Sequence, residues 1–283
     1  MKLKFYGSRG STPWFSKKNI KYGSNTSCLR IDTGKNIIII DCGSGLIQFA
    51  ADMIESNAWN KNSENHPQSV DILISHLHLD HIIGLAVFQP VWEKNNNIRI
   101  FTKSRDERPL ADQVFGLYQP PYWPVNLVEM NHAQMVTIQG EDSFMLGEGV
   151  KVTTMSACHP DTTMSFRIDA ENKSIVHLLD CEIDENFNGE DKLLKLCKDA
   201  DLVVFDGAYM PDDYPTKQGW GHSHYKMGIK LAELSGCKRV IFAHLAYDYT
   251  DETLQSFSRR DELCELGESG KYCFAYDGLE VEL

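Results

Sequence analysis

Hydrophobic residues in this chain occur mainly as short continuous runs, and most of these runs end in a polar or glycine-rich turn. Runs of this kind are typical of strands that are buried on both faces. We predict strands at residues 3–6, 27–32, 36–40, 70–74, 98–102, 134–138, 150–156, 164–168, 174–178, 202–205 and 239–243. Other segments predict helices at residues 45–56, 82–88 and 190–200, from the turn at 218–224 to residue 235, and at 250–265. The tail at 271–283 is expected to be extended.

The order of these elements predicts the architecture. Strands come first and then alternate with helices, in two similar halves with no linker or low-complexity tract between them. This order predicts an α/β protein in which two sheets pack face to face with helices outside, as a single domain of four layers over residues 1–283. Residues 57–68 are polar and are predicted to form a surface loop. Residues 117–124 are rich in aromatic side chains and proline, which suits either a pocket wall or a rigid packed loop remote from the site.

Composition narrows the possible classes of function. The 283 residues are 42% hydrophobic and 24% charged, which fits an ordinary globular protein. The formal net charge is −12, and no basic stripe of the kind that grips a long nucleic acid is visible. The eight cysteines form no CxxC pair, and the N-terminus lacks a signal-peptide core. No apolar stretch approaches the roughly 20 residues of a membrane span. We therefore expect a cytoplasmic protein with reduced thiols, which binds neither membranes nor long nucleic acids.

One stretch concentrates the side chains that bind metals. His76, His78, Asp80 and His81 directly follow the predicted strand 70–74. His76 and His78 are two positions apart, so in an extended backbone their side chains leave on the same side. Imidazole and carboxylate groups are common ligands of zinc and similar divalent metals. Because these groups exceed what one structural ion needs, we predict two metal ions side by side.

Further polar residues stand at the ends of other predicted strands. These are His159, Asp180 and His244, and a glycine-rich turn also presents His222. Such strand ends can gather at one edge of a layered α/β fold, where a ligand crevice is expected. Asp41 also ends a strand, and it is either a buried carboxylate that holds the metal loop or an ordinary turn residue.

The remaining histidines are expected to have no part in the site. His66 and His132 lie in polar loops and are expected to be solvated. His177 lies inside a predicted strand and is expected to be a core histidine with satisfied hydrogen bonds.

The spacing His76-x-His78-x-Asp80-His81, followed by isolated His, Asp and His at strand ends, resembles the metallo-β-lactamase fold superfamily over nearly the whole chain. The resemblance implies an αββα sandwich that holds two divalent metal ions, with Zn²⁺ expected and Mn²⁺ as the alternative. It implies that the first metal is held by His76, His78 and His159, the second by Asp80, His81 and His244, and that Asp180 bridges both. Lactamases proper usually have a cysteine at the bridging position, so Asp180 indicates the phosphodiesterase side of the superfamily.

Three further segments, at residues 7–13, 22–28 and 219–223, resemble a bacterial and phage subgroup related to tRNase Z, which includes cyclic nucleotide phosphodiesterases. The tRNase Z proteins carry His-Ser-Thr where this chain has His222-Ser223-His224, and they carry a basic arm that this chain lacks. The resemblance implies hydrolysis of a small phosphodiester, with a cyclic nucleotide as the leading candidate, by a hydroxide shared between two metals. The expected catalytic residues are Asp80, which is also a ligand, and His222, which would protonate the leaving oxygen.

Other functions stay open at this point. They are tRNase Z-like RNA 3′-end processing, hydrolysis of a lactam, lactone or thioester, and a non-catalytic metal protein that sequesters a nucleotide. The acidic charge disfavours the first, Asp180 and His222 disfavour the second, and the complete ligand set disfavours the third. A redox di-iron protein is disfavoured because such relatives carry glutamate in place of His78. We expect Asp206 to orient His222. His224 either assists His222 or packs in place of the Thr of the related triplet, and packing is the favoured role. We also expect a homodimer, because related proteins are often dimers.

Overall fold

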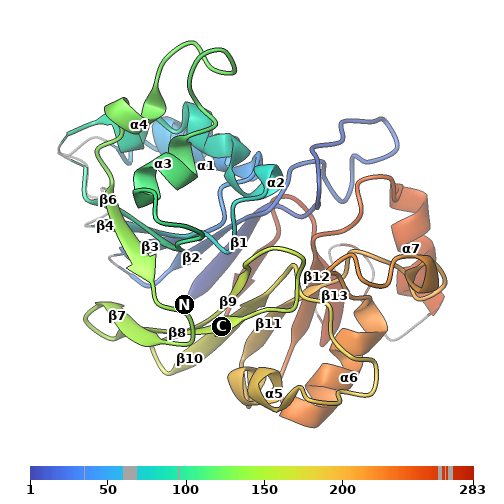
Figure 1. Cartoon of the computed structure of the whole chain (residues 1–283). Coiled ribbons are helices and arrows are strands. Elements are labelled where there is room, and N and C mark those ends of the chain that lie inside the picture. Colours follow the sequence, from blue (N-terminus) through green and yellow to red (C-terminus); the bar gives the residue numbers. More distant parts are fainter. Residues whose placement is uncertain (35, 60–68, 95, 261–262, 265, 267–269) are drawn as a thin grey trace.

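Two seven-stranded sheets form the centre of the molecule in the computed structural model, which describes residues 1–34, 36–59, 69–94, 96–260, 263–264, 266 and 270–283 (Figure 1). The first sheet has the strand order β14 (Glu280–Glu282), β1 (Lys2–Gly7), β2 (Cys28–Asp32), β3 (Asn36–Ile40), β4 (Ser69–Leu73), β5 (Ile98–Lys103) and β6 (Gln134–Ile138). The second has the order β13 (Tyr272–Phe274), β12 (Val240–Ala243), β11 (Leu202–Asp206), β10 (Lys173–Leu178), β9 (Met164–Ala170), β8 (Val150–Ser156) and β7 (Ser143–Gly147).

Both sheets are mixed, and each contains a parallel half. Strands β3 to β6 run parallel in the first sheet, and β10 to β13 run parallel in the second. The other half of each sheet is antiparallel, from β14 to β3 in the first and from β7 to β10 in the second. Strand β1 pairs with β14, so the two chain ends lie side by side. The carboxyl ends of parallel strands share an edge, which is where α/β folds place their ligand crevices.

The continuous apolar runs reflect burial of each sheet on both faces. Along β3, Ile38 and Ile40 face the second sheet, whereas Ile37 and Ile39 face the helices. Along β11, Val204 faces the first sheet and its two neighbours face the other way. Successive side chains of a strand point to opposite faces, so such a strand needs hydrophobic residues at every position. Each fully buried isoleucine side chain contributes roughly 1.5–3 kcal/mol through the area it removes from water.

Helices cover the two outer faces and complete the four layers. The outer face of the first sheet packs against α1 (Gly45–Glu55), α2 (Leu79–Ile82), α3 (Leu110–Phe115) and α4 (Leu127–Met130). The outer face of the second packs against α5 (Asp191–Cys197), α6 (Tyr225–Ser235) and α7 (Asp251–Arg260). The predicted αββα sandwich is confirmed. Within the described residues, no helix has both the length and the apolar character that crossing a membrane requires.

The structure corrects several predicted elements. The helix predicted at 82–88 is a 3₁₀ segment, Ile83–Val87, that follows the short α2. Helix α7 ends at Arg260 rather than 265, and Cys264 instead forms a bridge to β13. Strand β7 and helices α3 and α4 were not predicted, because each is short and partly exposed and so carries little hydrophobic periodicity. Most of the loop predicted at 57–68, with His66, lies outside the described residues.

Candidate metal centre and adjoining pocket

Histidines from the β4–α2 loop and from the loop after β8 form one cluster. His78 Nδ1 lies 2.8 Å from His76 Nε2 and 3.4 Å from His159 Nε2. His76 is buried, because it directly continues a central strand, whereas the side chain of His78 is about half exposed. Three ring nitrogens thus converge on one point, in the arrangement that a divalent ion requires of imidazole ligands.

A second cluster lies beside the first and joins α2 to the end of β12. Its members are Asp80, His81 and His244, all of them buried. His244 Nε2 is 3.2 Å from Asp80 Oδ2 and 3.3 Å from His81 Nε2. The rings of His81 and His244 are stacked with centroids 5.3 Å apart. This group again offers two imidazole nitrogens and a carboxylate oxygen around one point.

Asp180, at the end of β10, lies between the two clusters and directs one oxygen to each. Its Oδ1 is 3.8 Å from His76 Nε2 and 3.9 Å from His159 Nε2. Its Oδ2 is 3.2 Å from His81 Nε2 and 3.4 Å from His244 Nε2. Burial by itself would raise the pKa of Asp180, but the neighbouring histidines, His244 first among them, hold it well below its usual range. The carboxylate is therefore ionised at neutral pH.

The donor set fits two divalent ions. Asp180 Oδ2 is buried and has no hydrogen-bond donor among the described residues. A buried carboxylate oxygen without a donor is costly unless a cation lies against it. The converging ring nitrogens have the same requirement, since nitrogen lone pairs that face one another need a positive group between them. All seven predicted ligands are therefore brought together, and their role as ligands is part of the function proposed below.

Three residues of the centre have left-handed backbone conformations. Asp41, Asp180 and His244 have φ values of 61°, 51° and 58°. Non-glycine residues rarely adopt such angles, and the strain tends to persist only where the surrounding structure fixes it. Asp41 and His244 directly follow a strand, and Asp180 lies two residues after the end of β10. The sharp turn of the backbone places each side chain at the edge of the sheets.

Residues behind the clusters orient the rings. Asp41 Oδ2 is 2.8 Å from His81 Nδ1, and the Asp41 carboxylate also accepts hydrogen bonds from the backbone N–H and the hydroxyl of Ser75. The backbone N–H of Ser11 donates to Asp80 Oδ2 at 2.7 Å. The carbonyl of Gly221 lies 3.0 Å from His159 Nδ1. Of the two alternatives for Asp41, the buried carboxylate that holds the metal loop is the one observed.

Asp41→Asn should weaken metal binding while the fold is kept, because asparagine tolerates positive φ but cannot supply the charge that fixes His81. We expect a loss of metal affinity of roughly 10- to 100-fold, which is typical when the partner of a metal-binding histidine is removed. Competition with a chromogenic chelator measures this affinity. The matched control is Asp52→Asn on the surface helix α1, and an affinity equal to that of the control would contradict the assignment.

His222 lies beside both clusters and is held from behind. Its Nδ1 is 2.9 Å from Asp206 Oδ2 at the end of β11, so the expected orienting contact is present. Its ring stacks on His244 with centroids 4.9 Å apart and meets His159 edge-on at 5.3 Å. Burial would lower the pKa of His222, but Asp206 outweighs it and raises that pKa to about 9.

The turn before His222 depends on a residue that sequence reasoning missed. Glu182 accepts hydrogen bonds from the backbone N–H groups of Gly219 and Gly221 at 2.8 Å, and from the hydroxyl of Tyr214 at 3.1 Å. A side chain at Gly221 would overlap the ring of His159, and its φ of 88° also requires glycine. Sequence offered one weak signal, the position of Glu182 two residues after Asp180.

The predictions for His177 and His224 compare differently with the structure. His177 is buried in β10 as expected, but the prediction of satisfied hydrogen bonds is wrong, since neither ring nitrogen has a partner among the described residues. It lies 3.7 Å from Asp41 Oδ2, and burial first of all lowers its pKa to about 4. His224 contacts Glu185 at 3.4 Å and the ring of Tyr214, which agrees with a packing role.

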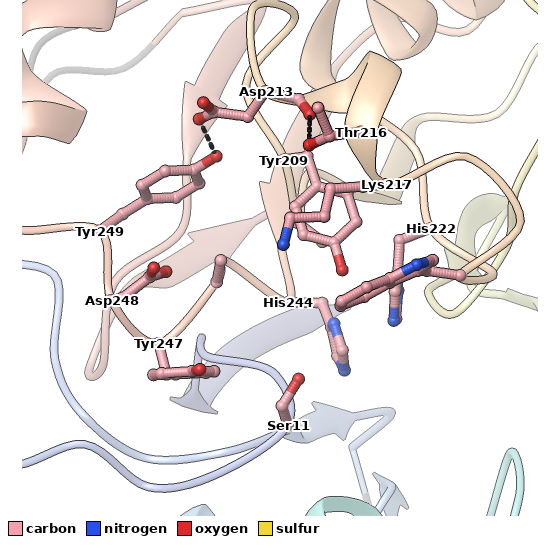
Figure 2. A pocket seen from close by; sticks show the side chains of 13 residues that line it. Ser11, Tyr209, Asp213, Thr216, Lys217, His222, His244, Tyr247, Asp248 and Tyr249 are labelled. Atoms are coloured by element: carbon pink, nitrogen blue, oxygen red, sulfur yellow. Dashed lines mark hydrogen bonds between the residues drawn. The ribbon is translucent and has the colours of Figure 1, made fainter.

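A pocket of about 410 Å³ opens directly beside the metal centre (Figure 2). It begins at His222 and His244 and extends to the segments 208–220 and 246–249, with Ser11 at its rim. The buried Arg9 holds the second of these segments by donating hydrogen bonds to the carbonyls of Ala246 and Tyr249, and it also donates to the carbonyl of Gly23. None of the residues 117–124 lines this pocket. Tyr118 instead donates a hydrogen bond to the carbonyl of Ile82, so this stretch is a packed loop.

The fold and the two clusters agree with what comparison with known proteins shows. Residues 36–245 match the family model of the β-lactamase superfamily domain. Ribonuclease Z from Myxococcus xanthus is 20% identical over 100% of this chain and 98% of its own length. The structure of a diphosphatase of the PhnP family has 16% identity and a TM-score of 0.70 over 100% of this chain and 97% of its own. Zn²⁺-bound PqqB from Methylobacterium extorquens has 16% identity and a TM-score of 0.71 over the full length of both chains.

The chain therefore belongs to the metallo-β-lactamase superfamily, as the His76–His81 spacing indicated. It is a metal-dependent hydrolase with the fold of that superfamily, in which two divalent metals typically lie between the histidine and aspartate clusters.

Proposed function

We propose that the protein hydrolyses a small phosphodiester, with a cyclic nucleotide as the leading substrate class. The observation that supports this most directly is the placement of Asp180, whose two oxygens face the two clusters separately. A carboxylate so placed would help to hold two divalent ions beside one another. That geometry suits displacement at a phosphodiester, in which both the attacking and the leaving oxygen need stabilisation.

The proposed ligands divide between two ions. The first ion would be held by His76, His78 and His159, the second by Asp80, His81 and His244, and both by Asp180. When bound, such ions lower the pKa of a water ligand toward about 7 and offset negative charge on the phosphate oxygens. We propose Zn²⁺ because imidazole nitrogen predominates in the set and because a structural neighbour holds zinc.

His222 is the proposed proton donor to the leaving oxygen, and Asp80 acts both as a ligand and in catalysis. Asp206 occupies His222 Nδ1, which leaves Nε2 as the nitrogen that faces the clusters and the pocket. The hydrogen bond from the N–H of Ser11 fixes one Asp80 oxygen toward His244. Both side chains are thus pre-oriented, so little reorganisation is needed when substrate binds.

RNA 3′-end processing is the second candidate, because the ribonuclease Z of Myxococcus xanthus matches over the full length of this chain. Against it, the net charge is −12, and RNA affinity rests heavily on phosphate neutralisation by lysine and arginine. Cytoplasmic location remains our proposal, in keeping with the pattern of cysteine use.

A turnover screen tests the proposed function. The zinc-loaded protein is assayed with 3′,5′- and 2′,3′-cyclic nucleotides, linear dinucleotides, a chromogenic phosphodiester and a tRNA precursor with a 3′ trailer. We expect kcat/KM for the best small phosphodiester to exceed that for the tRNA precursor, and chelation to abolish turnover of both. Faster cleavage of the precursor would establish the second candidate instead, and hydrolysis of none would overturn both.

A further inference from the structure

The pocket beside the metal centre has an unusual combination of charge and aromatic character. We infer that it receives the nucleobase of a substrate with a single phosphate, an inference that rests on the proposed function. The phosphate would lie at the His222 and His244 end, because that end opens onto the metal centre. A volume of about 410 Å³ falls within the range of small-molecule sites and leaves room for a nucleoside.

Aromatic side chains line the pocket walls and stay partly exposed. The side chain of Trp220 is 56% exposed and that of Tyr247 is 37% exposed, so both present aromatic surface to the pocket. The ring of Trp14 lies against that of Tyr247 in a tilted arrangement, with centroids 5.3 Å apart. Lys217 Nζ lies 4.3 Å from the centre of the Trp220 ring. Exposed aromatic rings that contact their neighbours are suited to stacking on a nucleobase. They accept any nucleobase, because every base has a π-face.

The charges of the pocket argue against a second phosphate. Beyond His222 and His244, which lie at the phosphate end, Lys217 is the one basic side chain among the lining residues, against two carboxylates, Asp213 and Asp248. Asp213 accepts a hydrogen bond from the hydroxyl of Tyr249, whereas Asp248 has no hydrogen-bond or ion-pair partner in the described part of the chain. Figure 2 shows Lys217 and Asp248 on opposite sides of the cavity. An uncharged base can donate an amino hydrogen to a carboxylate, but a second phosphate would be repelled by both carboxylates.

The aromatic walls and the carboxylates of the pocket distinguish cyclic mononucleotides from two other kinds of phosphodiester. A cyclic dinucleotide brings its second phosphate beyond the first sugar, toward the carboxylates. A phosphodiester without a base gains nothing from the aromatic walls. The cyclic mononucleotide is therefore the substrate that fits the pocket best. Trp220 and Tyr247 determine the affinity for its base, and Asp248 rejects a second phosphate.

The test compares three substrates on the zinc-loaded protein. They are adenosine 3′,5′-cyclic phosphate, the base-free 1-deoxyribose 3′,5′-cyclic phosphate, and a 3′,5′-linked cyclic dinucleotide. The wild-type protein should prefer the mononucleotide over the base-free analogue by about 5- to 150-fold in kcat/KM, the value of one stacked base. In the double variant Trp220→Leu/Tyr247→Leu this ratio should fall toward one, mainly through KM. The matched control Tyr122→Leu, at an exposed position that does not line the pocket, should keep it.

The charge is tested with a matched pair of substitutions. Asp248→Asn should raise the rate with the dinucleotide relative to the mononucleotide by about 5-fold, the Coulomb cost of one charge held close to another in water. Asp212→Asn removes the same charge from an exposed position that does not line the pocket, and it should leave the ratio unchanged.

Because each variant is scored by a ratio between two substrates, partial unfolding does not imitate either result. Equal rates on the mononucleotide and the base-free analogue, or a faster rate on the dinucleotide, would overturn the inference while phosphodiester hydrolysis stands. Hydrolysis of none of the three would overturn the proposed function itself.

Discussion

Asp180→Ala is expected to remove most of the activity and at least one of the two bound ions. Asp180 directs Oδ1 toward His76 and His159 and Oδ2 toward His81 and His244, so its loss disturbs both clusters together. The expected decrease in kcat/KM exceeds about 100-fold, the upper limit of what removing a residue behind a metal ligand usually costs. Elemental analysis and turnover of a chromogenic phosphodiester measure the two effects on one preparation.

A second substitution separates charge from backbone strain. Asp180 has a φ of 51°, where asparagine is tolerated, so Asp180→Asn keeps the shape and the backbone and removes only the charge. It should lose activity almost as severely as the alanine variant. The matched control is Asp201→Asn, on the same sheet just before β11, where the carboxylate binds Ser174 and Lys238. If either Asp180 variant keeps two ions and near-normal turnover, Asp180 does not bridge the ions.

His222→Ala is expected to keep both ions yet to lose roughly 10²- to 10⁴-fold in rate, the usual contribution of a positioned acid. The residue is not among the seven proposed ligands, and Asp206 holds it from behind at 2.9 Å. The loss should shrink for substrates with an acidic leaving group such as nitrophenolate, because these need no proton. Rates with a nitrophenyl ester and with an alkyl ester of similar size, measured on metal-loaded protein, give the comparison.

Two neighbouring variants sharpen this experiment. His224→Ala, two positions on, removes an imidazole that contacts Glu185 and Tyr214, and it should leave the leaving-group dependence unchanged. Asp206→Asn should show a weaker form of the His222 defect, because the ring loses the partner of its Nδ1. An equal loss for His222→Ala on both esters would reduce His222 to a phosphate-binding residue, and no loss on either would leave it only a structural residue of the turn before α6.

Local sequence determined the part of the centre that lies within one strand end. His76, His78, Asp80 and His81 are so close in sequence that extended backbone followed by a helix turn brings them together under almost any packing. The continuous apolar runs likewise determined the layered architecture, because a strand covered on both faces needs hydrophobic residues throughout. The resemblance carried by these residues supplied His159, Asp180 and His244, which no local spacing connects.

Tertiary structure alone decided how the separate strand ends face one another. The division of the two Asp180 oxygens between the clusters follows from the positions of β4, β10 and β12 in two different sheets. The same packing brings Glu182 to the turn before His222, where it accepts hydrogen bonds from the backbone. It also forms the pocket wall from residues 208–220 and 246–249. The sequence could not show these contacts. Its hydrophobic pattern indicates which faces of a strand are buried, but the order and register of the strands in the sheets determine which distant residues come into contact.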